Sequence, residues 1–250
     1  MRIKKAKFKS KFELERAQCI LMGISMKQTH QSGEKLDAFV NEINNYHNIK
    51  KVILVITDYL HRHYVRLEGN KSLEEAGNDA EKLGEAWIQE NKSILNKIPT
   101  EKLQIIKWKN LIDDESFNDC LSKVKEYYNT ENSFKKIVND YAINFGNKYF
   151  KQLQSNTTTL EACMLAARNY FFEESAIILK FISFKFDVMT YPGECNPGIS
   201  FIYNKSFGKP LNFIKYRFRN AGRENEFFPE SIKKQQEKNI HESYQLKKNI

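Results

Sequence analysis

The order of apolar and polar positions along the chain predicts an α/β fold. Residues 18–24 (QCILMGI) and 51–56 (KVILVI) are continuous apolar runs, which are typical of strands buried on both faces. Between them, residues 34–45 carry apolar side chains at helical spacing, at Leu36, Phe39, Val40 and Ile43. A strand, a helix and a second strand in this order predict a right-handed parallel crossover.

Similar patterns predict the remaining elements. Further strands are expected at residues 103–108, 186–190, 199–203 and 212–219. Further helices are expected at residues 72–95, 114–128, 133–150 and 160–184. The first of these helices begins with a capping box, in which Ser72 and Glu75 satisfy backbone N–H groups of the first turn. Residues 1–12 are expected to form an exposed arm or an edge strand.

The chain is expected to fold as a single domain. No internal repeat and no linker divides residues 1–230. Residues 231–250 are charged and poor in apolar side chains, so they predict a tail that is either a solvated helix or disordered.

The helix predicted at residues 160–184 contains a carboxylate within its apolar stripe. One face carries Cys163, Ala167, Tyr170, Glu174, Ile177 and Phe181, while Asn169, Glu173 and Lys180 are predicted to face solvent. Burying a carboxylate costs several kcal/mol unless it is paired or used. Glu174 is therefore a candidate site residue or half of a structural pair, unless a small rotation of the helix leaves it in solvent.

The charge of the chain favours a polyanionic partner. Lysine and arginine number 40 against 31 aspartates and glutamates, a formal net charge of +9. One basic cluster lies at the N-terminus, at Lys4, Lys5, Lys7, Lys9 and Lys11. A second is interleaved with aromatic residues and contains Lys205, Lys209, Lys215, Arg217, Arg219 and Arg223. Such mixtures suit phosphate contacts and base stacking, although edge strands with solvated lysines give the same pattern.

Several other classes of protein and site find no support in the sequence. The four cysteines, Cys19, Cys120, Cys163 and Cys195, are far apart, which favours reduced thiols in a cytoplasmic protein. No apolar run reaches the length of a membrane span, and no signal-peptide core follows the basic N-terminus. His61 and His63 diverge on a helix, so no metal site is expected. The chain has no GxSxG, Walker A or GxGxxG motif and no HIGH/KMSKS pair.

Polar residues follow three of the predicted strands. Ser25 follows the first strand, Thr57 and Asp58 follow the second, and Tyr191 follows the strand at residues 186–190. Because ligands of open α/β sheets bind beyond the carboxyl ends of the strands, these residues predict one pocket wall. The helix that carries Tyr170 and Glu174 would complete this pocket. Ser25 is then either a nucleophile or a loop residue that bonds the backbone.

Three segments resemble the signature blocks of the tRNA-dependent cyclodipeptide synthases. They are Leu21-Met22-Gly23-Ile24-Ser25, Asn169-Tyr170-Phe171-Phe172-Glu173-Glu174 and Val188-Met189-Thr190-Tyr191-Pro192. A weaker similarity extends from about residue 17 to residue 220. The resemblance implies a Rossmann-like parallel sheet flanked by helices, similar to class I tyrosyl- and tryptophanyl-tRNA synthetases. It also implies synthesis of a cyclic dipeptide from two aminoacyl-tRNAs, without ATP, metal or another cofactor.

The resemblance assigns roles to four residues. Ser25 corresponds to the nucleophile that accepts the first aminoacyl group as an ester. Tyr170 and Glu174 correspond to the pair that holds the ammonium group of the substrate, and Glu174 is expected to act as a base. Tyr191 corresponds to the residue that transfers a proton during ring closure. No histidine is evident near Ser25 in the sequence, and an activated ester substrate does not require one.

The sequence departs from one branch of that family at two positions. Gln28 and Pro192 stand where that branch has asparagine and histidine, which indicates the branch marked by Tyr-Pro. The hydrogen bonds that those asparagine and histidine side chains make in the other branch are therefore not expected here.

Substrate and tRNA contacts complete the sequence-based hypothesis. The pocket for the first side chain is predicted at Leu21, Gly23, Ile53 and Met189, which ordinary core packing explains almost equally well. The predicted tRNA contacts are Lys205, Lys209, Lys215, Arg217 and Arg219. We expect a monomer. Two alternatives stay open, another aminoacyl-tRNA-dependent transferase and a non-catalytic tRNA-binding module on a synthetase-like fold.

Overall fold

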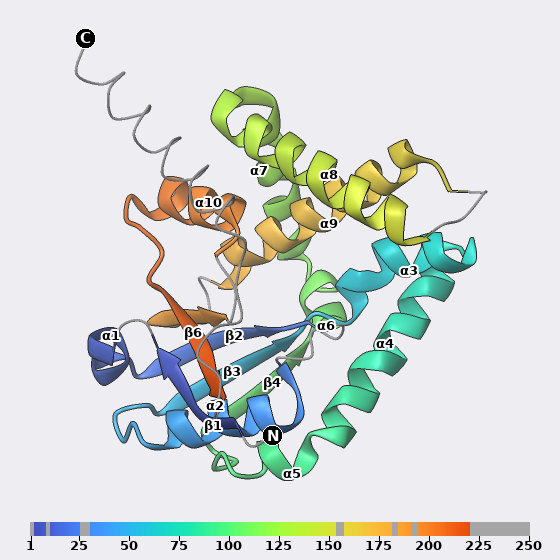
Figure 1. Cartoon of the computed structure of the whole chain (residues 1–250). Helices are drawn as coiled ribbons and strands as arrows, with labels where there is room; N and C mark the ends of the chain where they lie inside the picture. Colours follow the sequence, from blue (N-terminus) through green and yellow to red (C-terminus); the bar gives the residue numbers. More distant parts are fainter. Residues whose placement is uncertain are drawn as a thin grey trace.

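A six-stranded sheet forms the centre of the fold, with the order β1-β6-β5-β2-β3-β4 (Figure 1). Its strands are β1 (Ile3–Phe8), β2 (Cys19–Ile24), β3 (Lys51–Ile56), β4 (Leu103–Lys107), β5 (Val188–Tyr191) and β6 (Phe213–Asn220). The strands from β6 to β4 are parallel, and β1 pairs antiparallel with β6 at one edge. The structure is a computed structural model, which describes residues 3–8, 11–25, 31–153, 158–181, 185–191 and 195–220. The predicted tail at residues 231–250 lies outside this range.

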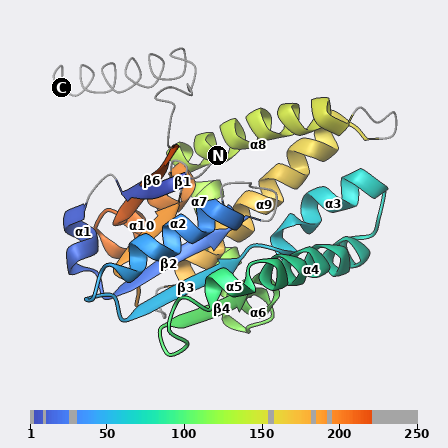
Figure 2. The same cartoon turned by 60° about the horizontal axis from the view of Figure 1, so that its bottom comes forward.

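Helices cover both faces of the sheet (Figures 1 and 2). On one face, α2 (Gly33–Asn44) and α5 (Lys92–Leu95) pack against alternate residues of the strands, such as Ile20 and Met22. On the other face, α7 (Ser116–Thr130), α8 (Asn132–Leu153), α9 (Leu160–Phe181) and α10 (Pro197–Phe207) form one apolar cluster with the intervening residues of the strands, such as Leu21. In this cluster α7, α8 and α10 all pack against α9. Strands with both faces covered need a continuous apolar run, which explains the composition of β2 and β3.

The remaining helices connect these layers. They are α1 (Lys11–Arg16), η2 (Tyr59–His61), α3 (Arg62–Gly69), α4 (Leu73–Glu90) and α6 (Trp108–Ile112). None of the helices in the described ranges is long and apolar enough to cross a membrane. None of the four cysteines, all of which lie in the described ranges, forms a disulfide, and Cys19 and Cys163 are buried.

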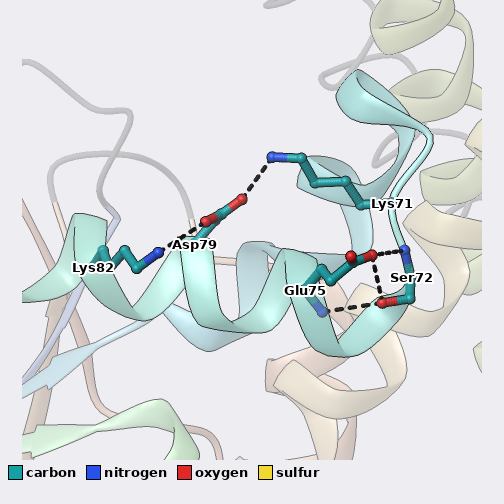
Figure 3. Close-up of polar contacts among 5 residues, drawn as sticks. All are labelled: Lys71, Ser72, Glu75, Asp79 and Lys82. Carbon is teal, nitrogen blue, oxygen red and sulfur yellow. Dashed lines mark hydrogen bonds and ion pairs between the residues drawn. The ribbon is translucent and has the colours of Figure 1, made fainter.

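The start of α4 confirms the predicted capping box (Figure 3). Ser72 Oγ accepts a hydrogen bond from the Glu75 N–H at 3.2 Å, and Glu75 Oε2 accepts one from the Ser72 N–H at 3.0 Å. The predicted helix at 72–95 is nevertheless divided at Asn91. The buried Asn91 side chain accepts a hydrogen bond from the Gly33 N–H and donates one to the Trp87 carbonyl. Asn91 therefore connects the end of α4 to the start of α2.

One predicted strand is wrong. Residues 199–203 lie within helix α10, although their apolar run resembles a strand. Asn196 Oδ1 caps this helix by accepting the Gly198 N–H at 2.9 Å, and Pro197 occupies its first position. Gly208 ends it with a φ of 65°, in the left-handed region. The other predicted strands are confirmed, and so is the edge strand expected near the N-terminus.

Candidate active site

The strand order places Ser25 and Tyr191 at a topological switch point. From β2 the chain proceeds through β3 to β4 on one side, and β5 and β6 lie on the other side (Figure 1). The parallel register pairs Met22 with Thr190, so the carboxyl ends of β2 and β5 are neighbours. Ser25 follows β2, and Tyr191 ends β5. Ligands of doubly wound sheets bind at this kind of crevice.

A cavity of about 390 Å³ opens at this point, with a mixed polar and aromatic wall. Its lining residues are Gly23, Ser25, Thr57, His61, Tyr64, Tyr141, Phe145, Tyr170, Glu174, Met189, Tyr191, Cys195, Asn196, Pro197, Ile199 and Phe213. The four residues with predicted catalytic roles are among them, together with Gly23 and Met189. Leu21 and Ile53 are fully buried in the core on the α9 side of the sheet and do not belong to this lining.

Ser25 is held by its backbone and contacts a histidine through its side chain. Its N–H donates to Gln31 Oε1 at 2.8 Å, and Gln31 Nε2 donates in turn to the Gly23 carbonyl at 2.5 Å. Gln31 is fully buried. Ser25 Oγ lies 3.3 Å from His61 Nε2. Neither Gln31 nor His61 was predicted as a site residue from the sequence. The available signal was the position of His61 shortly after β3, at the same edge of the sheet as Ser25.

Glu174 lines the cavity from α9, as the apolar stripe predicted. Burial raises the pKa of its carboxyl to about 7, although a hydrogen bond from Asn196 Nδ2 at 2.9 Å acts in the opposite direction. Asn196, which was not predicted as a site residue, thus both caps α10 and contacts Glu174. A carboxyl with this pKa is partly ionised near neutral pH, so it can pair with an ammonium group or accept a proton from one.

Tyrosine side chains surround Glu174. Burial raises the pKa values of Tyr64, Tyr141, Tyr170 and Tyr191, and the nearby charge of Glu174 raises them further. For Tyr191 the pKa is about 12. These hydroxyls therefore stay protonated near neutral pH, and they can donate hydrogen bonds or relay protons but do not carry negative charge.

The predicted solvent side of α9 is wrong at Glu173. This residue is 7% exposed, and its carboxylate accepts two hydrogen bonds from Arg62, at 2.6 and 2.9 Å, and contacts His63 Nε2 at 2.7 Å. Burial alone would raise its pKa, but His63 and Arg62 outweigh burial and lower it. Glu173 therefore ties α9 to α3, on a different side of the helix from Glu174.

Lys180 is the second residue of that predicted solvent side that is buried. It is 9% exposed, and its Nζ lies 2.5 Å from Asp114 Oδ1. The pair holds the pKa of Asp114 at about 2. Lys180 thus connects α9 to the start of α7.

Replacing Glu173 with glutamine is expected to destabilise the fold. The change leaves the Arg62 guanidinium buried without a countercharge, which costs about 3–5 kcal/mol. Because the pKa of Glu173 is lowered, its contribution is present above the unfolded value near 4.5 and is lost as the pH falls through the folded value. Urea denaturation at pH 7 measures the change, with the exposed Glu161→Gln on the same helix as control. Equal stability of the two variants would contradict a structural role for the ion pair.

The predicted tRNA-contacting residues lie on α10 and β6. Lys205 is exposed on α10 and pairs with Glu131 at 2.8 Å, and Lys209 is exposed after that helix. Lys215 is opposite Tyr191 in the pairing of β5 with β6. Arg217 and Arg219 are opposite two basic residues of β1, Lys7 and Lys5 respectively. The sheet thus brings the two basic clusters of the sequence together at its edge.

Two further expectations from the sequence concern the branch of the family marked by Tyr-Pro and the absence of a metal site. Gln28 and Pro192 lie outside the described residues. Within the described parts of the chain, no three His, Cys, Asp or Glu side chains gather in a way that could hold a metal ion.

Comparisons with known proteins give structural matches. No family model matches the chain, and no curated protein sequence does. A CDPS from Fluoribacter dumoffii is 22% identical, with a TM-score of 0.78 over 88% of this chain and 99% of that chain. The cyclodipeptide synthase from Candidatus Glomeribacter gigasporarum, solved bound to Phe-tRNAPhe, is 34% identical, with a TM-score of 0.70 over 84% of this chain and 92% of that chain.

A third match defines the class of fold. A Mycobacterium tuberculosis protein, whose structure demonstrates that cyclodipeptide synthetases are related to type I tRNA synthetases, is 12% identical, with a TM-score of 0.56 over 88% of this chain and 96% of that chain. The fold is therefore Rossmann-like and of the synthetase-related kind, as predicted. Given the 34% identity over nearly the whole solved relative, the chain belongs to the cyclodipeptide synthase family and is an aminoacyltransferase.

Proposed function

We propose that this enzyme joins the aminoacyl groups of two aminoacyl-tRNAs into a cyclic dipeptide through a covalent intermediate on Ser25. The observation that carries the proposal is that Ser25, Glu174 and Tyr191 line one cavity at the switch point of the sheet. A serine can supply the nucleophile, and a partly ionised carboxyl and a neutral tyrosine can supply the proton transfers, for acyl transfer to an amine. The family membership and the relative bound to Phe-tRNAPhe support tRNA as the carrier.

In the first step, Ser25 Oγ attacks the ester carbonyl of an aminoacyl-tRNA. The bond from that carbonyl to the terminal ribose oxygen breaks, and an aminoacyl-serine ester forms. Exchange of one ester for another needs little driving force, so no ATP is consumed. The fixed backbone of Ser25, bonded to Gln31, keeps the nucleophile at the cavity wall.

In the second step, the amino group on the aminoacyl-serine attacks the ester carbonyl of a second aminoacyl-tRNA. The bond from that carbonyl to the terminal ribose oxygen breaks, this oxygen takes up a proton as the second tRNA leaves, and a dipeptidyl-serine forms. Before the attack, Tyr170 and Glu174 hold the amino group of the aminoacyl-serine as an ammonium ion. A pKa of about 7 lets Glu174 accept a proton from it, so that the amine attacks as a free base.

In the third step, the free amine of the dipeptide attacks the serine ester, closes the ring and releases Ser25. Tyr191 relays the proton from this amine to Ser25 Oγ as the bond from the carbonyl carbon to Oγ breaks, since the Tyr191 side chain lines the same cavity and its hydroxyl stays protonated near neutral pH. The Tyr191-Pro192 pair supports the branch of the family marked by Tyr-Pro.

The first aminoacyl side chain is proposed to bind at the sheet side of the cavity. Gly23 and Met189 line it there, and Leu21 and Ile53 are buried neighbours that support this wall from the core. The absence of a side chain at Gly23 leaves open space, since a Cβ there would meet no atom within 4 Å.

The tRNA is proposed to lie along the edge formed by β6 and β1. The backbone register pairs Lys7 with Arg217 and Lys5 with Arg219, so basic positions of both strands come together at this edge, which favours an anionic partner. Lys215, next to Tyr191 in register, connects this edge to the cavity. Lys205 on α10 and Lys209 just after this helix extend the basic surface.

Replacing Lys215, Arg217 and Arg219 with alanine is expected to weaken tRNA binding and reduce its salt dependence. Each lost phosphate contact makes the negative slope of log K against log salt shallower by about 0.7–0.9, because fewer counterions are released. Filter binding at several salt concentrations measures both quantities. The matched control is Lys82→Ala on α4, an exposed lysine whose loss should leave the slope unchanged. If Lys82→Ala has the larger effect, the tRNA contacts α4 instead.

Product analysis tests the proposed function directly. The enzyme is incubated with total aminoacyl-tRNA, and cyclic dipeptides are identified by mass spectrometry. Transfer of an aminoacyl group to another acceptor, or tRNA binding without any product, would instead favour one of the two alternative functions.

A further inference from the structure

We propose that His61 is the general base that removes the proton from Ser25. The inference rests on the proposed function for its substrate, but the contact itself belongs to the folded chain. His61 Nε2 lies 3.3 Å from Ser25 Oγ, and both side chains line the cavity. A ring nitrogen at this distance is within reach of the hydroxyl hydrogen.

The fold holds His61 in place through several contacts. His61 ends η2, which begins where Asp58 Oδ1 accepts the Tyr59 N–H at 2.8 Å, and the His61 N–H donates to the Asp58 carbonyl at 2.9 Å. The Tyr170 ring meets the imidazole edge-on, with 5.8 Å between centroids. The imidazole therefore lies between the end of β2 and helix α9.

The two residues after His61 fix the same segment to α9. Arg62 and His63 both contact the buried Glu173 carboxylate, at distances from 2.6 to 2.9 Å. In Figure 1, the segment at α3 lies next to α9. Glu173 is thus a positioning residue for His61, whereas the neighbouring Glu174 faces the cavity.

The other titratable groups on the cavity wall are less suited to this task. The hydroxyls of Tyr64, Tyr141, Tyr170 and Tyr191 stay protonated, because burial raises their pKa values. The Glu174 carboxyl accepts a hydrogen bond from Asn196, and Cys195 Sγ contacts Ser200 Oγ at 3.2 Å, so the contacts of both groups are with residues other than Ser25. A neutral imidazole at hydrogen-bonding distance is a competent base near neutral pH.

The proton transfer balances within the first step. The Ser25 O–H bond breaks as Oγ bonds to the ester carbonyl carbon, and the proton passes to His61 Nε2. This requires the neutral tautomer that carries its hydrogen on Nδ1. When the bond from the carbonyl carbon to the ribose oxygen breaks, the imidazolium returns the proton to that oxygen. His61 is neutral again, and no other reactant is needed.

The first test measures acylation of Ser25 in a single turnover. His61→Gln is expected to slow formation of the aminoacyl-serine ester by about 10²- to 10⁴-fold, because the amide cannot take up the proton. Binding of tRNA and the melting temperature should be close to those of the wild type. The exposed His47→Gln is the matched control and should acylate at the normal rate. Acylation of His61→Gln at a near-normal rate would overturn the proposal.

The second test needs no tRNA, so it separates this proposal from the proposed function. In the Ser25→Cys variant, iodoacetamide alkylation of the introduced thiol is followed by peptide mass spectrometry, with the native cysteines as internal references. A histidine base at this distance increases the thiolate fraction at pH 7, so adding His61→Gln should slow alkylation of that thiol by about 10-fold. An unchanged alkylation rate would overturn the proposal. Slower alkylation in a protein that forms no aminoacyl ester, even as wild type, would support His61 as the base and overturn the proposed function.

Discussion

Replacing Glu174 with glutamine is expected to slow cyclic dipeptide formation by about 10²- to 10⁴-fold, the range of a general acid–base contribution. Glutamine keeps the shape and the hydrogen bond with Asn196, but it removes the charge that holds the ammonium group and the oxygen that accepts its proton. The rate is measured from product formed at saturating aminoacyl-tRNA. The exposed Glu161→Gln on α9 is the control and should leave the rate unchanged.

The same substitution is expected to stabilise the protein above neutral pH. The folded pKa of Glu174, about 7, lies above the unfolded value of 4.5, so the ionised form is disfavoured in the folded state. Its cost is absent below about pH 4.5, grows as the pH rises to 7, and reaches about 3 kcal/mol by linkage. Glu174→Gln should therefore melt at a higher temperature than the wild type at pH 8 and at a similar temperature at pH 4.5. A lower melting temperature at pH 8 would make Glu174 a structural partner and contradict its assignment to the site.

The strands and the apolar stripe of α9 could be predicted because they depend on local periodicity. Strands β2 and β3 are buried on both faces, so their sequences are apolar throughout. The stripe from Cys163 to Phe181 places Glu174 at the cavity because helical spacing determines which side chains share a face. The position of Ser25 follows from the general geometry of parallel sheets.

The solvent side of α9 could not be predicted, because this helix is packed on several sides. Glu173 is buried against Arg62 and His63, more than a hundred positions earlier in the sequence, and Lys180 is buried against Asp114. Periodicity identifies the polar positions on a helix. It does not show whether a charged residue from a distant part of the chain pairs with them and allows them to be buried. The strand predicted at residues 199–203 was wrong for a different reason. Its apolar run is too short to distinguish a strand from a helix, and the caps at Asn196 and Gly208 make it part of helix α10.

The polar contacts of the site could not be predicted from the sequence pattern either. His61 reaches Ser25 only because β2 and β3 are neighbours with a register that pairs Ile24 with Ile56. Asn196 reaches Glu174 only because α10 packs against α9. Both contacts depend on three-dimensional packing. They are therefore the part of the mechanism that only the structure could suggest.

Incubating the enzyme with one kind of aminoacyl-tRNA is expected to leave an aminoacyl ester on the peptide that contains Ser25. The ester should be labile at alkaline pH, unlike an amide, and peptide mass spectrometry locates it. Ser25→Ala should lose the adduct and reduce product formation by at least about 10⁴-fold, since removal of a catalytic nucleophile has effects of this size. It should still bind tRNA, because the proposed contacts lie on β6, β1 and α10.

Two further variants separate a covalent intermediate from a merely structural serine. Ser32→Ala, which changes a nearby partly buried serine that makes no side-chain cap bond in α2, should keep both the adduct and the product. Ser25→Cys should form a thioester in place of the ester, since a thiolate at the same position is a competent nucleophile. Direct transfer between two bound tRNAs predicts the opposite pattern, with no adduct on Ser25 at any time. Product from Ser25→Ala at a near-normal rate would exclude the covalent route through Ser25, because the first aminoacyl group would then reach the second without a serine at this position.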